Sequence, residues 1–265
     1  MTLVGRHDNG FANLVAGAEA GRKHGAIGYL NTDWGDGGHP QPLAVSYAPF
    51  LVGAAVSWCR KTYNQSLLVP VLSRDVFHDA TQRLAKAAIA MGFAHRKFGY
   101  REANITPFGA VIAAPPPETR ELFCRSGLKY YARIPAPKIR AALAELEKHR
   151  AGANHAKPAS QSGQWLQTEL DLAARMAAAS CQVMLWQQAL AAGRKRLARR
   201  LGQRGIRQLL QIEREFAAYW PARNKATTAK CSPFLQWRIA DYRRGRLHFP
   251  PAVARVTKAK TYAAE

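Results

Sequence analysis

The chain has 265 residues, of which 48% are hydrophobic and 21% are charged, a composition typical of a folded globular protein. Its 39 basic and 17 acidic residues give a formal charge of +22, which favours polyanionic partners such as nucleic acid, acidic polysaccharide or an anionic membrane surface. No apolar run is long enough for a transmembrane helix, and residues 1–9 lack the apolar core of a signal peptide. We therefore expect a cytoplasmic protein, unless the natural N-terminus lies further upstream.

The first 60 residues predict a helix, a strand, a polar loop and a second helix. Residues 8–24 have helical periodicity with Asp8 as the cap, and the short apolar segment 26–30 is predicted as a buried strand. Three glycines and two prolines make 31–43 a loop, and 45–58 predicts the next helix. This order is typical of parallel α/β barrels, but a single strand cannot satisfy its own backbone groups. We therefore expect a piece of a (β/α)8 barrel.

The remainder of the chain predicts helices and connectors. The pattern indicates helices over 75–93, 118–131, 137–149 and 233–244, and 104–113 is either a short helix or an apolar loop. Residues 151–163 are rich in Gly, Ala, Ser and Lys and are the best candidate linker.

A long helix is predicted from about Leu166 to Leu201, with Gly193 as its weak point, and another helix ends before Pro221. The expected fold class is mostly α, a C-terminal fragment of a (β/α)8 barrel followed by an α-helical domain. The expected regions are the barrel end at 1–62, a helical connecting region at 63–150 and a helical C-terminal domain at 151–265.

No metal or cofactor site is predicted. The four cysteines are far apart in the sequence and show no CxxC spacing, and the eight histidines show no HxH or HExxH spacing. We expect the cysteines to be small apolar residues of helix faces.

The segment Gly25-Ala-Ile-Gly-Tyr-Leu-Asn-Thr-Asp-Trp-Gly-Asp-Gly-Gly-His-Pro-Gln-Pro-Leu43, followed by Gly53-Ala-Ala-Val-Ser-Trp58, resembles the last barrel strand of glycoside hydrolase family 20. This is the β-N-acetylhexosaminidase-like family, and the resemblance is closest to bacterial members with a long helical C-terminal extension. Residues 5–9 (Gly-Arg-His-Asp-Asn) and 220–224 (Trp-Pro-Ala-Arg-Asn) also resemble that group. The specific part of the resemblance covers about residues 1–60.

The resemblance implies a sugar subsite in the loop. Trp34 would stack on the pyranose ring of an N-acetylhexosaminide, and Asp36 would accept hydrogen bonds from sugar hydroxyls. Asp33 and His39 lie in the same loop and could support Asp36. Pro40 departs from the family, where an aromatic residue is common at this place.

The catalytic residues of that family are missing from this chain. The family uses an adjacent Asp-Glu pair in substrate-assisted hydrolysis, and no Asp-Glu dipeptide occurs in the sequence. The general acid and the other strands would have to precede Met1. We therefore expect the chain to be inactive alone, so its classification as an enzyme stays open.

Each loop residue also has a simpler interpretation. Trp34 could be a core or capping aromatic residue, and His39 a solvated or backbone-bonded histidine. Asp33 and Asp36 could brace the loop and cap the next helix through Asx turns, which we favour for Asp33 and leave open for Asp36.

The densest basic run supports a different function. Its cations include Arg194, Lys195, Arg196, Arg199 and Arg200, followed by Arg204 and Arg207, with no acidic residue among them. The simplest interpretation is a solvated helix face. The alternative is a stand-alone basic helical protein that binds nucleic acid or another polyanion.

Overall fold

The computed structural model of the chain describes residues 2–34, 40–99, 105–113, 133–225 and 227–247. These residues are mostly helical, which confirms the expected mostly-α class, and none of them forms a β-strand. The prediction of a buried strand at 26–30 is therefore wrong: this segment has no regular secondary structure, and Ile27 and Leu30 are exposed.

The described residues up to Gly99 contain four α-helices. They are α1 (His7–Lys23), α2 (Tyr47–Trp58), the short α3 (Leu68–Val71) and α4 (Arg83–Met91). A π-helical turn follows α3 at Leu72–Val76. Short 3₁₀ turns lie at Leu43–Val45, Arg60–Thr62, Gln65–Leu67 and Ala94–Phe98. The predicted helices at 8–24 and 45–58 are confirmed within two residues.

The helix predicted over 75–93 begins later than its apolar pattern indicates. Asp79 causes this difference, because its carboxylate accepts hydrogen bonds from the backbone N–H groups of Thr81 (3.1 Å) and Leu84 (3.0 Å). Short acidic side chains stabilise a turn before a helix in this way. Only Arg83–Met91 is therefore α-helical in this region.

The C-terminal part consists of six described α-helices. They are α5 (Pro107–Ile112), α8 (Ala136–Asn154), α9 (Gln161–Ala191), α10 (Lys195–Tyr219), α11 (Thr228–Cys231) and α12 (Pro233–Arg244). A 3₁₀ turn at Trp220–Ala222 ends α10. The helix predicted at 233–244 is confirmed, 104–113 contains a short helix, and the helix predicted at 118–131 lies outside the described residues.

The linker predicted at 151–163 is mostly helix. Helix α8 continues to Asn154 and α9 begins at Gln161, so only 155–160 connect them. This connection is fixed to the core, because the N–H of Ala159 donates to the backbone oxygen of His78 (2.8 Å). Within this segment, Ala153 and Gly163 are buried, so small side chains at these two places allow close packing.

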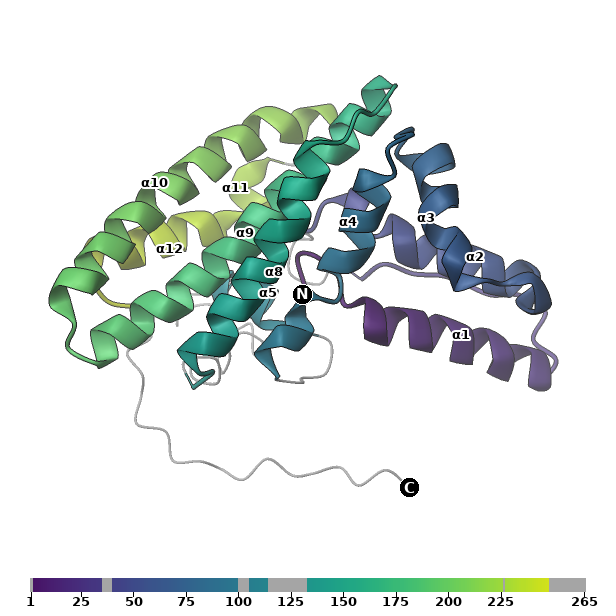
Figure 1. Cartoon of the computed structure of the whole chain (residues 1–265), viewed down its shortest axis with the longest axis horizontal. Helices are drawn as coiled ribbons and strands as arrows, with labels where there is room; N and C mark the ends of the chain where they lie inside the picture. Colours follow the sequence, from purple (N-terminus) through teal and green to yellow (C-terminus); the bar gives the residue numbers. More distant parts are fainter. Residues whose placement is uncertain (1, 35–39, 100–104, 114–132, 226, 248–265) are drawn as a thin grey trace.

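The single long helix predicted to Leu201 is two helices. Gly193 has a φ of +65°, and the N–H of Arg194 donates to the oxygen of Ala189 (2.9 Å). This is the left-handed glycine that ends many helices, and it reverses the chain here. Helices α9 and α10 consequently form a hairpin (Figure 1).

Helix α9 is the centre of the fold. It packs against α5, α8, α10 and the turn Leu43–Val45. Small buried residues along it, including Ala173, Ala174 and Ala177, allow its neighbours to approach closely. Helices α1 and α2 pack on each other at the other end of the molecule, with α4 between them and α8 (Figure 1).

Candidate functional site

Residues 31–46, which we call the Trp34 loop, contain the sugar-site residues predicted from the sequence. The structure describes 31–34 and 40–46 of this loop, so the positions predicted for Asp36 and His39 lie outside the described residues. Trp34 is 79% exposed, and its Nε1 donates to the hydroxyl of Thr32 (3.0 Å). It is not a core residue of this chain, and an exposed indole held in a loop can stack on a ligand.

Asp33 braces the loop against the start of α2. Its Oδ2 accepts a hydrogen bond from the hydroxyl of Ser46, the residue that precedes α2. Gln41 also donates to this hydroxyl (3.3 Å), and its side-chain oxygen accepts from the hydroxyl of Thr2 (2.7 Å). Asp33 thus contacts the residue before α2 through a hydroxyl rather than through the Asx turn suggested from the sequence, and Pro40 of the same loop is buried.

The segment that leads into the loop lies along α1 and α2. The hydroxyl of Tyr29 donates to the backbone oxygen of Leu14 in α1 (3.0 Å), and Asn31 donates to that of Pro49 in α2 (3.4 Å). Leu30, between them, is 86% exposed. An exposed side chain thus lies between two side chains that hydrogen-bond to the helices, although the segment itself has no regular secondary structure.

A fully buried carboxylate attaches the end of the loop to the helical region. Glu169 of α9 accepts hydrogen bonds from the N–H of Ala44 (2.8 Å), the hydroxyl of Tyr219 (2.8 Å) and Nε of Arg223 (2.9 Å). A buried carboxylate is tolerated only when donors or cations surround it. The loop end, α9 and the end of α10 are therefore held at one point.

The partners of Glu169 show the effect of its charge. Burial lowers the pKa of Arg223, but the hydrogen bond and the charge of Glu169 outweigh burial and leave this pKa raised. Burial, with the charge of Glu169, raises the pKa of Tyr219. Both side chains consequently stay in the form that donates to the carboxylate.

Sequence analysis missed Glu169, although a signal exists. Glu169 interrupts the apolar face formed by Leu166, Leu170 and Ala173, and a lone acid on such a face predicts a buried, paired carboxylate. Its partner Arg223 belongs to the Trp220–Asn224 motif that carries part of the family resemblance.

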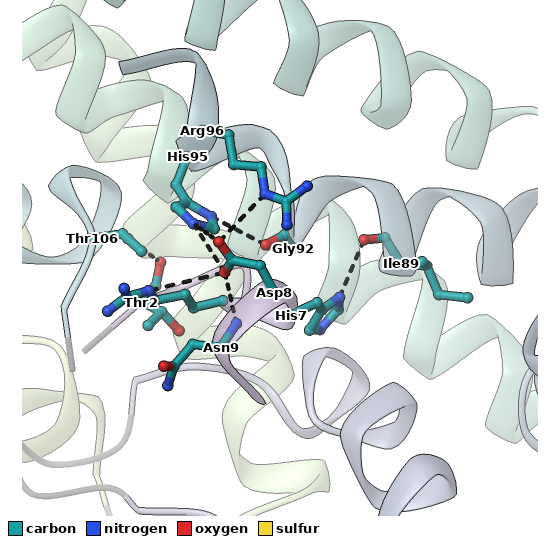
Figure 2. A network of polar contacts seen from close by, with 10 residues as sticks. Thr2, His7, Asp8, Asn9, Ile89, Gly92, His95, Arg96 and Thr106 are labelled. Atoms are coloured by element: carbon teal, nitrogen blue, oxygen red, sulfur yellow. Dashed lines mark hydrogen bonds and ion pairs between the residues drawn. The ribbon is translucent and has the colours of Figure 1, made fainter. Parts of the chain in front are cut away.

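A second polar cluster fixes the beginning of α1 (Figure 2). Asp8 was predicted to cap this helix, but it lies in the first turn after the cap residue Arg6. Its carboxylate instead pairs with Nε2 of His95 (3.2 Å) and Nε of Arg96 (3.3 Å), both from the turn Ala94–Phe98. The other ring nitrogen of His95 lies 3.1 Å from the oxygen of Gly92.

Burial dominates the protonation of the two histidines beside Asp8. Burial lowers the pKa of His7, whose Nδ1 lies 3.1 Å from the oxygen of Ile89. Burial also lowers the pKa of His95, against the opposing charge and hydrogen bond of Asp8. For Asp8, burial works to raise the pKa, but His95, the N–H of Asn9 and Arg96 together leave it lowered.

The predicted basic residues lie far from the Trp34 loop. Arg194, Lys195, Arg196, Arg199 and Arg200 are exposed at the beginning of α10. Tyr219, which contacts Glu169, is at the other end of this 25-residue helix, roughly 36 Å away at 1.5 Å per residue. The fold therefore does not bring the two predicted sites together.

No model of a known protein family, no curated protein and no solved structure matches the chain. Within the described ranges, no group of three or more His, Cys, Asp or Glu residues is placed to hold a metal ion. No helix in that same part of the chain is long and apolar enough to cross a membrane.

The substitution Glu169→Gln is expected to lower the free energy of unfolding by about 2–4 kcal/mol. It removes the counter-charge of Arg223, and the new amide NH2 group faces N–H and O–H groups that cannot accept its hydrogen bonds. Urea denaturation measures this change. Glu19→Gln, which removes the exposed ion pair with Arg60, serves as the control and is expected to cost less than about 1 kcal/mol. Equal costs for the two variants would contradict the anchoring role of Glu169.

Acidification from pH 7 to pH 5 is expected to destabilise the protein. The folded-state pKa of His7 and of His95 lies below the unfolded value of about 6.5, so the unfolded chain binds more protons in this range. Each histidine adds up to about 1.4 kcal/mol per pH unit to the slope of stability against pH. The lowered pKa of Asp8 matters only below about pH 4, where its protonation removes a further contribution.

Urea denaturation of His95→Gln across this pH range tests the assignment. We expect a shallower slope than in the original protein, because the variant removes one histidine whose pKa burial lowers in the folded state. An unchanged slope in His95→Gln would show that this residue is not a source of acid sensitivity.

Proposed function

We propose that the chain is the C-terminal portion of a family 20-like glycoside hydrolase of the β-N-acetylhexosaminidase type. In this proposal, residues 1–62 supply the last unit of a (β/α)8 barrel, in which the segment 26–30 would pair as a strand only beside the other barrel strands. The Trp34 loop supplies part of the sugar subsite. The helices after residue 63 support this unit from outside.

The arrangement of residues 26–31 supports the barrel part of the proposal. In a parallel barrel, helices cover the outer face of each strand, and the inner face points into the barrel. Tyr29 and Asn31 contact α1 and α2, as outward-facing strand residues contact helices, and Leu30 points away from both. The segment thus has helices on one side and an uncovered face where the barrel interior would lie.

Exposed apolar side chains also fit a surface that other strands cover. Ile27 is fully exposed and Leu30 is 86% exposed. Both belong to the segment that would lie beside the neighbouring strands of a barrel. Concentrated apolar exposure is typical of a surface that contacts another protein segment.

The exposed indole of Trp34 is the observation that carries the sugar-binding part. It follows the strand-like segment directly, where barrel enzymes place their binding residues. A flat indole can cover the C–H face of an N-acetylhexosaminide, and a loop carboxylate such as Asp36 can accept hydroxyl hydrogen bonds. Asp33 is engaged with Ser46, so we assign it a supporting role only.

This chain would bind sugar without cleaving it. The family's adjacent Asp-Glu pair does not occur in the sequence, so a glycosidic bond would be cleaved only with an acid supplied from outside these 265 residues. Binding residues and catalytic residues would then come from different barrel strands.

The test uses the protein expressed from its complete natural reading frame and assayed with 4-nitrophenyl N-acetyl-β-D-glucosaminide. We expect hydrolysis, and we expect Trp34→Ala to lower kcat/KM at least tenfold, about 1.4 kcal/mol of transition-state binding. Trp58→Ala changes an equally exposed indole outside the loop and is expected to change kcat/KM less than about twofold.

Two results would overturn the proposal. One is the absence of hydrolysis of any β-linked N-acetylhexosaminide by the natural protein. The other is an equal loss of kcat/KM in Trp34→Ala and Trp58→Ala with unchanged thermal melts, because Trp34 would then have no specific contact with the sugar.

A further inference from the structure

The beginning of α10 has a dense and unneutralised positive surface. We define the basic surface as the exposed cations Arg194, Lys195, Arg196, Arg199 and Arg200 of α10, together with Arg243 of α12. None of these six side chains forms an ion pair within the described residues. Arg204 and Arg207 extend the same positive charge along the helix.

Charges along α10 are segregated. Its second half carries Glu213 and Glu215, and Glu215 pairs with Arg175 of α9. Arg175 also pairs with Asp171, which in turn pairs with Arg150 of α8. Acids therefore neutralise the cations around the second half of α10, whereas the first half has none and its cations repel one another.

The basic surface includes cations from two helices, α10 and α12. A groove of about 410 Å³ lies between α9, α10 and α12, and Lys195, Arg199 and Arg243 line it. Its floor is apolar and includes Trp186 and Tyr242. The groove thus places the α12 cation beside two α10 cations, so that an extended anion can contact both helices at once.

We propose that the basic surface binds the phosphate backbone of double-stranded nucleic acid without sequence specificity. Five of its six cations are arginines, whose planar guanidinium groups bind phosphate oxygens in pairs. Arg199 and Arg200 each lie about one helical turn after Arg196 in α10, at i+3 and i+4, so one backbone can contact Arg196 together with either of them. Release of counterions from the duplex drives such binding.

Other partners fit this surface less well. A membrane-bound helix needs several exposed apolar residues beside its cations, but Ala198, Leu209 and Ile212 of α10 are buried, and Leu210 is the exposed large apolar residue among its described positions. A single strand needs exposed aromatic rings on which bases stack, and the aromatic rings of the groove, Trp186 and Tyr242, are buried. A duplex backbone requires neither feature.

This binding is independent of sugar binding. The basic surface lies at the opposite end of α10 from the contact between Tyr219 and Glu169. A protein that has lost one site can therefore keep the other, and each can be tested separately.

Fluorescence anisotropy with a labelled 20-base-pair duplex of arbitrary sequence tests the proposal, at salt concentrations from 50 to 200 mM. We expect binding that weakens steeply with salt. The triple variant R196E/R199E/R200E is expected to bind at least tenfold more weakly at 50 mM salt. Its plot of log affinity against log salt concentration is expected to lose about three units of slope, about 0.9 for each lost phosphate contact.

The matched control is K61E/R83E/K86E, which makes the same change in net charge at exposed positions outside the basic surface. We expect the control to bind within about threefold of the original protein, since it removes no direct phosphate contact. Circular dichroism melts of both triple variants establish that they remain folded, and R196Q/R199Q/R200Q, with a smaller charge change, provides a second measurement if the glutamate variant unfolds.

Three results would overturn the proposal. The first is no duplex binding by the original protein at 50 mM salt. The second is an equal loss of affinity in the two triple variants, which would indicate a general effect of net charge. The third is binding to poly-glutamate or to vesicles containing phosphatidylserine that is as tight as duplex binding and equally sensitive to R196E/R199E/R200E.

Discussion

The position of the Trp34 loop relative to the C-terminal helices depends on the buried carboxylate of Glu169. It joins the backbone of Ala44, at the end of the Trp34 loop, to Tyr219 and Arg223 at the end of α10. Removing any one donor leaves a buried charge incompletely solvated, so the three contacts are expected to break together. This is why a loop rich in glycine and proline can end at a fixed position.

Residues 26–34 precede the loop end that Glu169 anchors, and several of their side chains are exposed. Side chains that face α1 and α2 make hydrogen bonds, whereas Leu30 and Trp34 face solvent. Burying such apolar surface stabilises a protein by roughly 25 cal/mol per Å², so a covering segment would gain free energy by docking here. A barrel supplies that cover through neighbouring strands, and it would also place Trp34 at the edge where barrels bind their ligands.

Much of the helical content was predictable because local signals and tertiary packing agree. Helix α12 begins at a proline and ends before Gly245, and both of its boundaries were predicted from the sequence. Gly193 was identified as a weak point, but its left-handed conformation, which separates α9 from α10, depends on how the two helices pack. The strand at 26–30 could not form, since strands need partners and none is present in the described part of the chain. In the candidate site, the sequence singled out Asp33 but not its contact with Ser46, which lies 13 residues away. The contact between Glu169 and Ala44 joins residues 125 positions apart and leaves only an indirect signal in the sequence.

We propose that this chain completes a barrel whose other strands and whose Asp-Glu pair are encoded elsewhere. The most direct measurement is the nucleotide sequence upstream of the Met1 codon, read together with the intact mass of the natural protein in its own cells. We expect an uninterrupted upstream reading frame that encodes further barrel strands with an adjacent Asp-Glu pair, and a natural protein much heavier than 29.2 kDa. An in-frame stop codon directly upstream, with a natural protein of 29.2 kDa, would contradict it.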